Sequence, residues 1–420
     1  MDKLISFSIP LMLSGILQLM FNAVDIVVVG RFSGSQALAA VGSTTALINV
    51  FTNLFIGISL GANVLAARYY AAGKTKEMSE TVHTAIALAL VSGVAMAVIG
   101  VVFARGALEI MGTPDDVIAK STLYMRIYFC GMPFFMMYNY GAAILRAVGD
   151  TKRPLIFLIV SGVINAVLNL FLVIVFHLDV AGVGIATVIS QLVSCILVLR
   201  CLHHTESSYQ LHLAKLRIRS VYLKQIFEVG VPAGIQSTVI NISNAMLQSS
   251  VNSFGSIAMA GYTASNNIFG FLYVSVNSFT QACMSFTSQN YGVKKLKRMD
   301  RVLIDCMILS VVVTLILGSS VYIFGPELLH IYSNQADVIK YGMEIFSYTT
   351  VTYFLCGLMD LFPGALRGMG YSTVPMILSI IGTVGVRIIW IYGLFPSHRS
   401  LTFLFLSYPV SWDWQRSSCR

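Results

Sequence analysis

The chain has 420 residues, of which 56% are hydrophobic and only 11% are charged, and its formal net charge is +9. Soluble domains carry about a quarter charged residues. This composition therefore excludes an ordinary soluble domain, and the positive charge points to membrane topology rather than to nucleic acid. The stretch from Val229 to Val293 has no Asp, Glu, Lys or Arg and is long enough for two spans of about 20 residues. We predict an all-α polytopic membrane protein.

Uncharged runs separated by breakers give the predicted spans in chain order. They cover 4–29, 37–67, 82–103, 121–145, 155–177, 183–202, 226–253, 257–289, 302–324, 339–366 and 374–395. A basic, His-containing connector at 203–224 separates the sixth span from the seventh, and a final apolar run begins at Leu401. The run after Lys3 is too long for a signal-peptide core. The seven cysteines lack metal-ligand spacing, so we expect no structural metal and no cofactor.

The sequence repeats itself with a constant offset in numbering. "IMGTPDDVI" (110–118) returns as "IYSNQADVI" (331–339), and "LRAVGDTKRP" (145–154) returns as "LRGMGYSTVP" (366–375), both with the same offset. Pro10 matches Pro232 with an offset that is larger by one. An even number of spans in each half gives both halves the same orientation. We therefore predict two parallel six-helix repeats related by an axis along the membrane normal.

The last span is shorter than the repeat requires. A twelfth span is expected near 404–424, but apolar character is lost after "LSYPVSW". About ten apolar residues cannot cross a hydrocarbon core of about 30 Å. We thus predict a twelve-helix plan with a truncated last helix. It has an N-terminal lobe at 1–202, a cytoplasmic connector at 203–224, and a C-terminal lobe at 225–420 with five full spans and a partial sixth.

The connectors alternate in charge. One set is basic and holds Lys74, Lys76, Arg146, Lys152, Arg153, Arg200, Lys215, Arg217, Arg219, Lys224, Lys294, Lys295, Lys297, Arg298 and Arg301. The other set holds a few basic residues and most of the loop acids. The positive-inside rule places the basic set and the N-terminus in the cytoplasm, so we expect a multi-pass protein of the inner or plasma membrane.

Polar residues recur at helical spacing within several predicted spans. The first span has Ser14, Gln18 and Asn22 followed by Asp25, the fifth has Asn165 and Asn169, and the seventh has Gln236, Asn241, Asn244 and Gln248. Interhelical hydrogen bonding is one explanation for each stripe. Several stripes in repeat-related helices favour a water-filled cavity, with Gln18, Asn22, Gln236 and Asn241 among its lining.

Two acids within predicted spans are candidate functional residues. Asp25 is either an end charge near the membrane surface or an ion or proton site, since intramembrane acids usually mark such paths. Asp360 is a second candidate for the cavity, and its repeat mate is Asn139. Around Asn139, Met136 and Tyr138 belong to a Met and aromatic cluster that could bind flat apolar cations, although packing roles are equally compatible.

Catalytic motifs are absent. The sequence has no HExxH, no P-loop and no GxSxG. We therefore expect a transporter rather than an enzyme. Without a nucleotide site, transport has to draw on an ion gradient or on a partner.

"VDIVVVGRFSGSQALAAVG" (24–42), "AGVGIATVIS" (181–190) and the "LRAVGDTKRP" box with its repeat resemble the multidrug and toxic compound extrusion (MATE) family. The resemblance covers nearly the whole chain. It implies a cation-coupled antiporter with twelve helices in two lobes. It also implies an ion-coupling site at Asp25, Asn165, Asn169 and Thr187, where Asn169 replaces an acid found in other members. Sodium coupling is therefore in doubt, and a single carboxylate suits proton coupling slightly better.

The expected function is export of small organic, mostly cationic, drugs or toxic metabolites, coupled to H⁺ or Na⁺ with a possible Na⁺ near Asp25. Alternating access of two lobes is the expected mechanism. Two alternatives stay open: a lipid or polysaccharide flippase of the same superfamily, and an inactive truncated transporter. Besides its substrate and membrane lipid, we expect no nucleic acid partner and a monomer.

Overall fold

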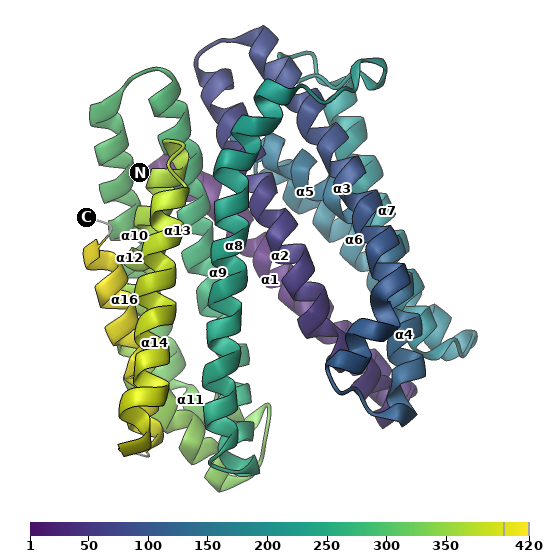
Figure 1. The fold of residues 1–420 in the computed structure, drawn as a ribbon, viewed down its shortest axis with the longest axis vertical. Helices are drawn as coiled ribbons and strands as arrows, with labels where there is room; N and C mark the ends of the chain where they lie inside the picture. Colours follow the sequence, from purple (N-terminus) through teal and green to yellow (C-terminus); the bar gives the residue numbers. More distant parts are fainter. Residues whose placement is uncertain (398–399, 419–420) are drawn as a thin grey trace. The chain divides into compact units, whose positions relative to one another are not determined.

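The computed structural model describes residues 1–397 and 400–418, and within these ranges it contains helices and turns but no strand (Figure 1). The helices of the first half are α1 (Asp2–Phe32), α2 (Ser35–Ala71), α3 (Thr75–Ile110), α4 (Asp115–Cys130), α5 (Met132–Ala147), α6 (Lys152–Leu170) and α7 (Asp179–His204). Those of the second half are α8 (Ser220–Asn252), α9 (Ser256–Gly292), α10 (Leu296–Ile323), α11 (Gly325–His330), α12 (Ala336–Gly368), α13 (Thr373–Ser379), α14 (Val386–Ile389), α15 (Leu401–Phe405) and α16 (Ser407–Ser418).

Short irregular helices interrupt this pattern. Three are π-helical: Phe171–Val175, which continues α6, and Ile380–Gly385 and Trp390–Leu394, which flank α14. Leu213–Lys215 and Phe395–Ser397 form single 3₁₀ turns. The π-helical segments therefore occur in the fifth and eleventh predicted spans, which are repeat mates.

Seven described helical stretches are long and apolar enough to cross a membrane, or eight if a bent stretch counts as one span. The bent stretch is α12, whose parts 336–350 and 352–368 differ in direction by 52°. The helices α8 and α9 are long enough but rich in Ser, Asn and Gln. Each predicted span coincides with one of these helices or with a broken helix such as α4 and α5, which meet at Gly131. The all-α polytopic class is confirmed.

The chain forms two compact units. One comprises Leu13–Gly234, and the other comprises Met1–Met12 together with Ile235–Arg420. The beginning of α1 thus belongs to the unit made by the second half, and the beginning of α8 belongs to the unit made by the first half. The connector at 203–224 lies within the Leu13–Gly234 unit.

In the Leu13–Gly234 unit, α2 and α8 approach each other through glycines. A Cβ atom at Gly57 would lie 2.3 Å from the Cα of Gly234, and one at Gly61 would lie 2.1 Å from the carbonyl oxygen of Ile226. Both helices carry a G-x-x-x-G spacing, Gly57 with Gly61 and Gly230 with Gly234, which permits close backbone contact in membranes.

In the other unit, the beginning of α1 packs on α9 and α10. Leu4, Phe7 and Leu11 share a buried cluster with Phe279 and Cys283, among others. The amino group of Met1 lies 3.5 Å from the Asp305 carboxylate. The beginnings of α1 and α8 therefore each pack on helices from the other half of the sequence.

Backbone conformation supports the repeat. Glycines with left-handed φ angles recur at the offset of the sequence motifs: Gly34 and Gly255 have φ of 87° and 96°, and Gly149 and Gly370 have 96° and 97°. At these positions any L side chain would be strained. Gly73 corresponds in the same way to Lys294, with φ of 67° and 56°. The repeat read from the sequence is thus a repeat of turn geometry.

The final run packs within its unit. Trp412 and Gln415 are buried, and α16 is helical past the apolar run from which a partial span was predicted. Nε2 of Gln415 donates to Oγ of Ser379 at 2.6 Å, and Thr383 donates to Oε1 of Gln415. These hydrogen bonds join α16 to the end of α13 and to the π-helical segment after it.

Candidate ion-coupling and substrate sites

Three helices of the Leu13–Gly234 unit bring the four predicted ion-coupling residues together. Asn165 and Asn169 are one turn apart on α6 and are both buried. Nδ2 of Asn169 donates to the Asp25 carboxylate on α1 and to Oδ1 of Asn165, the latter at 3.2 Å. Nδ2 of Asn165 lies 3.5 Å from Oγ1 of Thr187 on α7. The four side chains therefore form one continuous hydrogen-bonded series.

The members of this series differ in whether all their polar atoms have hydrogen-bond partners. Thr187 donates back to the Val183 carbonyl at 2.9 Å. Oδ1 of Asn169 is buried and has no hydrogen-bond partner in the described part of the chain. Buried polar atoms are nearly always paired, so this acceptor beside an acid indicates a missing partner such as a water, a proton donor or a cation.

The donor set can hold a small cation. Asp25, Asn165, Asn169 and Thr187 all offer oxygen atoms, which hard cations prefer. The orphaned Oδ1 of Asn169 is compatible with such a ligand. With a single carboxylate the set provides one negative charge, which matches either Na⁺ or a proton on Asp25.

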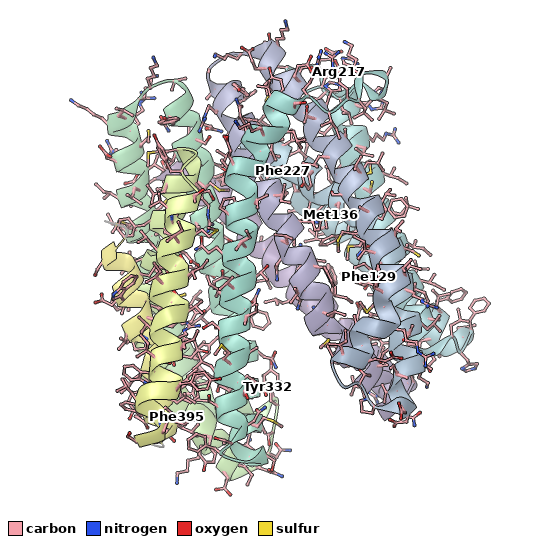
Figure 2. All side chains as sticks on the ribbon, viewed as in Figure 1. Phe129, Met136, Arg217, Phe227, Tyr332 and Phe395 are labelled. Atoms are coloured by element: carbon pink, nitrogen blue, oxygen red, sulfur yellow. The ribbon has the colours of Figure 1, made fainter. Side chains whose placement is uncertain are left out.

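The predicted cavity residues of this unit lie apart from the series. Gln18 and Asn22 are exposed on α1. Met136 is fully buried within α5, where Figure 2 labels it, and Tyr138 is also buried. The Tyr138 hydroxyl donates to the Pro154 carbonyl at 3.1 Å, and Asn139 donates to the Phe135 carbonyl at 2.8 Å. In this structure the Met and aromatic cluster is therefore part of the packed interior.

The predicted cavity residues of the other unit form a second network. Nε2 of Gln236 donates to Oγ of Ser379 at 2.7 Å, and Arg367 donates to Oε1 of Gln236 at 2.5 Å. The Asp360 carboxylate accepts a hydrogen bond from the Tyr273 hydroxyl and interacts electrostatically with Arg367. Asn241 is exposed on α8.

A buried arginine completes the polar interior of this unit. Arg387 on α14 is 2% exposed, and its Nη1 donates to Oδ1 of Asn244 at 2.8 Å and to Oγ of Ser243 at 3.3 Å. Its guanidinium carbon lies 4.6 Å from the centre of the Tyr408 ring. Arg387 is not among the site residues predicted from the sequence. A charged residue within the eleventh span was the signal that could have identified it.

The connector packs on the beginning of α3. The buried His83 accepts the His212 backbone N–H at Nε2 (3.1 Å), and its Nδ1 lies 2.6 Å from the Ser79 carbonyl oxygen. Glu80 pairs with Arg217, labelled in Figure 2, and with Arg219. Partial burial lowers the pKa of His212, as do Lys215, His83 and His203 nearby. In this arrangement one His83 nitrogen faces a carbonyl acceptor and the other faces a backbone donor.

Comparison with known proteins agrees with this fold. The family model MatE matches residues 10–171 and again 232–392. The probable multidrug resistance protein YoeA of Bacillus subtilis is 30% identical over 91% of this chain and 84% of its own length. The multidrug export protein MepA of Staphylococcus saprophyticus is 23% identical over 93% of this chain and 86% of its own.

Solved structures give the same result for the fold. An outward-facing multidrug resistance MATE family transporter of the MOP superfamily matches with a TM-score of 0.90 and 19% identity, over 99% of this chain and 93% of its own. A variant of the Vibrio cholerae MATE transporter VcmN matches with a TM-score of 0.92 and 18% identity, over 100% and 94%. The double match, one to each half, reproduces the repeat, and the relatives are transporters rather than enzymes. The chain is a member of the MatE family of multi-pass membrane transporters.

Proposed function

We propose that this protein is a cation-coupled antiporter that exports organic, mainly cationic, compounds by alternating access of two six-helix halves. The contact between Asn169 and Asp25 carries the proposal, because it holds an acid of α1 against amides of α6 inside a transporter. Burial of an acid in a membrane span costs free energy, and such acids usually belong to ion or proton pathways. The coupling ion is H⁺ or Na⁺.

Proton coupling is supported by the two polar atoms of the Asn169 side chain, the donor Nδ2 and the acceptor Oδ1. Ionised Asp25 accepts a hydrogen bond from Nδ2 of Asn169. Protonated Asp25 is a donor, so it pairs best with Oδ1 of Asn169, which has no partner among the described residues. The two protonation states thus connect α1 and α6 differently. Since a ligand shifts a conformational equilibrium only by its differential affinity, the proton would favour one facing state and substrate the other.

Substrate and cellular location extend the same proposal. The relatives are named as multidrug resistance and multidrug export proteins, and we carry that activity over to small organic cations for this chain. We place the protein in the inner or plasma membrane as a monomer. Its N-terminus and basic connectors would face the cytoplasm, as the positive-inside rule requires. The comparisons do not favour the flippase alternative.

Efflux of a cationic dye from proteoliposomes under an imposed H⁺ or Na⁺ gradient tests the proposal. Asp25→Asn should abolish gradient-dependent efflux while the protein still inserts and folds. Asp115→Asn, which removes an exposed acid of the same unit, should transport like the wild type. Gradient-dependent efflux by Asp25→Asn at the wild-type rate would refute the coupling role.

A further inference from the structure

The unit that contains Ile235–Arg420 holds a buried positive charge without a described acid beside it. Arg387 is 2% exposed, and no described Asp or Glu lies within ion-pair distance of its guanidinium. Buried charges in proteins are normally paired with an opposite charge. In a membrane span an unpaired arginine is especially costly. A negatively charged partner of Arg387 is therefore missing from the described part of the chain.

Hydrogen bonding around Arg387 is incomplete on one side. Nη1 is used twice, toward Asn244 and Ser243, and the Tyr408 ring covers the guanidinium face. Nε is buried and has no partner in the described part of the chain. Guanidinium groups bind carboxylates and phosphates through two adjacent N–H groups. The edge that includes Nε remains for such a ligand, while Asn244 and Tyr408 fix the orientation of the group.

The backbone around Arg387 is also unusual. The short helix α14 lies between two π-helical segments, Ile380–Gly385 and Trp390–Leu394. Such segments occur frequently at functional sites. Three further elements reach the arginine or its ring partner: α8 with Asn244, α16 with Tyr408, and α9 with Tyr262, whose hydroxyl lies 3.2 Å from that of Tyr408. The group is thus surrounded by a built polar site rather than by lipid.

The repeat relates this cluster to the coupling site of the other unit. Tyr408 is the repeat mate of Thr187 at the constant offset, and Arg387 corresponds to the residue directly after Asn165. Asn244 on α8 is the repeat mate of Asn22 on α1, at the offset that also relates Pro232 to Pro10. The equivalent sets of helices therefore hold a carboxylate on α1 in one unit and a guanidinium on α14 in the other, at positions that are not repeat mates.

We propose that the Arg387 cluster is a binding site for an oxyanion, a carboxylate or phosphate group, and that this group belongs to an exported zwitterion or to a lipid headgroup. The substrate form of the proposal rests on the proposed export function. It widens the substrate class from cations to molecules that also carry an anionic group. Arg387 would bind that group directly through its Nε edge.

Two matched dyes test the substrate source. One is a rhodamine with a free carboxylate, a zwitterion at neutral pH, and the other is its methyl ester, a cation. Binding to purified protein in phosphatidylcholine nanodiscs is measured by fluorescence anisotropy for the wild type, Arg387→Gln, Arg387→Lys and the control Arg126→Gln, which removes an exposed arginine of the other unit. Arg387→Gln should weaken zwitterion binding by about tenfold or more and ester binding by less than about twofold. Zwitterion binding by Arg387→Lys should be intermediate, because an ammonium keeps the positive charge but lacks the two adjacent N–H donors of a guanidinium. Arg126→Gln should bind both dyes as the wild type does.

A separate experiment tests whether the oxyanion belongs to a lipid headgroup. Phosphatidylglycerol is added to the nanodiscs, and the thermal midpoint is compared between wild type and Arg387→Gln. A rise in the wild type alone assigns the site to a lipid phosphate, whereas the dye difference assigns it to a substrate. Equal losses for both dyes, together with no Arg387-dependent effect of phosphatidylglycerol, would overturn the proposal in favour of a purely structural arginine.

Two further readouts keep the test independent of folding and of the export proposal. If Arg387→Gln does not fold, the wild type alone decides: it must bind the zwitterion at least as tightly as the ester or be stabilised by phosphatidylglycerol, and failure of both refutes the site. Ester efflux from proteoliposomes reports separately on the export function. Loss of that efflux with intact zwitterion binding would therefore count against the export function and not against the oxyanion site.

Discussion

The close approach of α2 and α8 predicts that single methyl groups will destabilise the Leu13–Gly234 unit. In Gly57→Ala the new Cβ lies 2.3 Å from the Cα of Gly234, whereas non-bonded carbon atoms are at their best separation at about 3.5–4.0 Å. The helices must therefore separate by about 1 Å or bend. Backbone atoms are the obstacle, so no side-chain rotation can relieve the clash. Gly42 lies on the same helix and has nothing within 4 Å of its virtual Cβ, which makes Gly42→Ala the matched control.

The expected size of the effect follows from two opposing terms. Replacement of glycine by alanine inside a helix stabilises it by up to about 1 kcal/mol, and both variants gain this term. Overpacking of a filled interface costs about 1–3 kcal/mol, and only Gly57→Ala incurs it. The two variants should therefore differ by about 1–3 kcal/mol, with Gly42→Ala at or above the wild type and Gly57→Ala below it.

Thermal unfolding of the purified proteins in one detergent, followed by tryptophan fluorescence and by size-exclusion chromatography of heated samples, measures this difference. Gly61→Ala, whose Cβ would lie 2.1 Å from the Ile226 carbonyl oxygen, should behave like Gly57→Ala. Equal midpoints for Gly57→Ala and Gly42→Ala would show that the glycine contact between α2 and α8 is absent in the protein in solution.

Three further outcomes are expected. Asn169→Asp adds a second carboxylate to the coupling site and should increase the dependence of efflux on Na⁺ at fixed pH; an unchanged dependence would mean that the asparagines only tie helices together. Gln415→Leu removes the oxygen acceptor of the buried Thr383 hydroxyl and one of the two amide donors to Ser379, and should cost about 1–3 kcal/mol in the free energy of unfolding, seen as a lower thermal midpoint than that of the exposed-site control Ser417→Ala. His83→Leu removes the acceptor for the His212 N–H and should speed tryptic cleavage of the connector, whereas His83→Gln, which keeps a donor and an acceptor, should be cleaved at close to the wild-type rate; equal rates for the two variants would show that this hydrogen bond does not hold the connector.

The helices could be predicted from the sequence because lipid leaves the backbone few alternatives. A span without water must satisfy its own N–H and C=O groups, so uncharged runs of sufficient length become helices. The turns that the structure shows at Gly34 and Gly255 are separated by the same offset that relates the sequence motifs. The i, i+4 spacing of Asn165 and Asn169 placed both amides on one face of α6, as the structure has them.

Contacts between distant segments could not be derived in this way. The spacing within α6 does not reveal that Asp25 on α1, much earlier in the chain, contacts Asn169 on α6. The family resemblance supplied that grouping. The assignment of the beginnings of α1 and α8 to the opposite units was also hidden, because an uninterrupted helical pattern does not report which unit each of its turns packs against. Gln415 was missed for a related reason: beyond the apolar run it was read as a polar end, while the structure buries it against Ser379.

The repeat explains why the two halves share geometry without sharing chemistry. The constant offset preserves the turns, because a left-handed backbone or a close helix contact tolerates few replacements. Side chains inside the conserved frame are free to differ in charge, and Asp25 in one unit and Arg387 in the other are the outcome. A frame duplicated in the same orientation would place two like charges in equivalent positions if its polar residues were also copied. In this chain each unit instead offers a charge of its own sign: Asp25 lies at the proposed coupling site, and Arg387 lies at the proposed oxyanion site. The charge of the ligand, and not the shape of the fold, is therefore the property on which substrate assays for this protein should vary first.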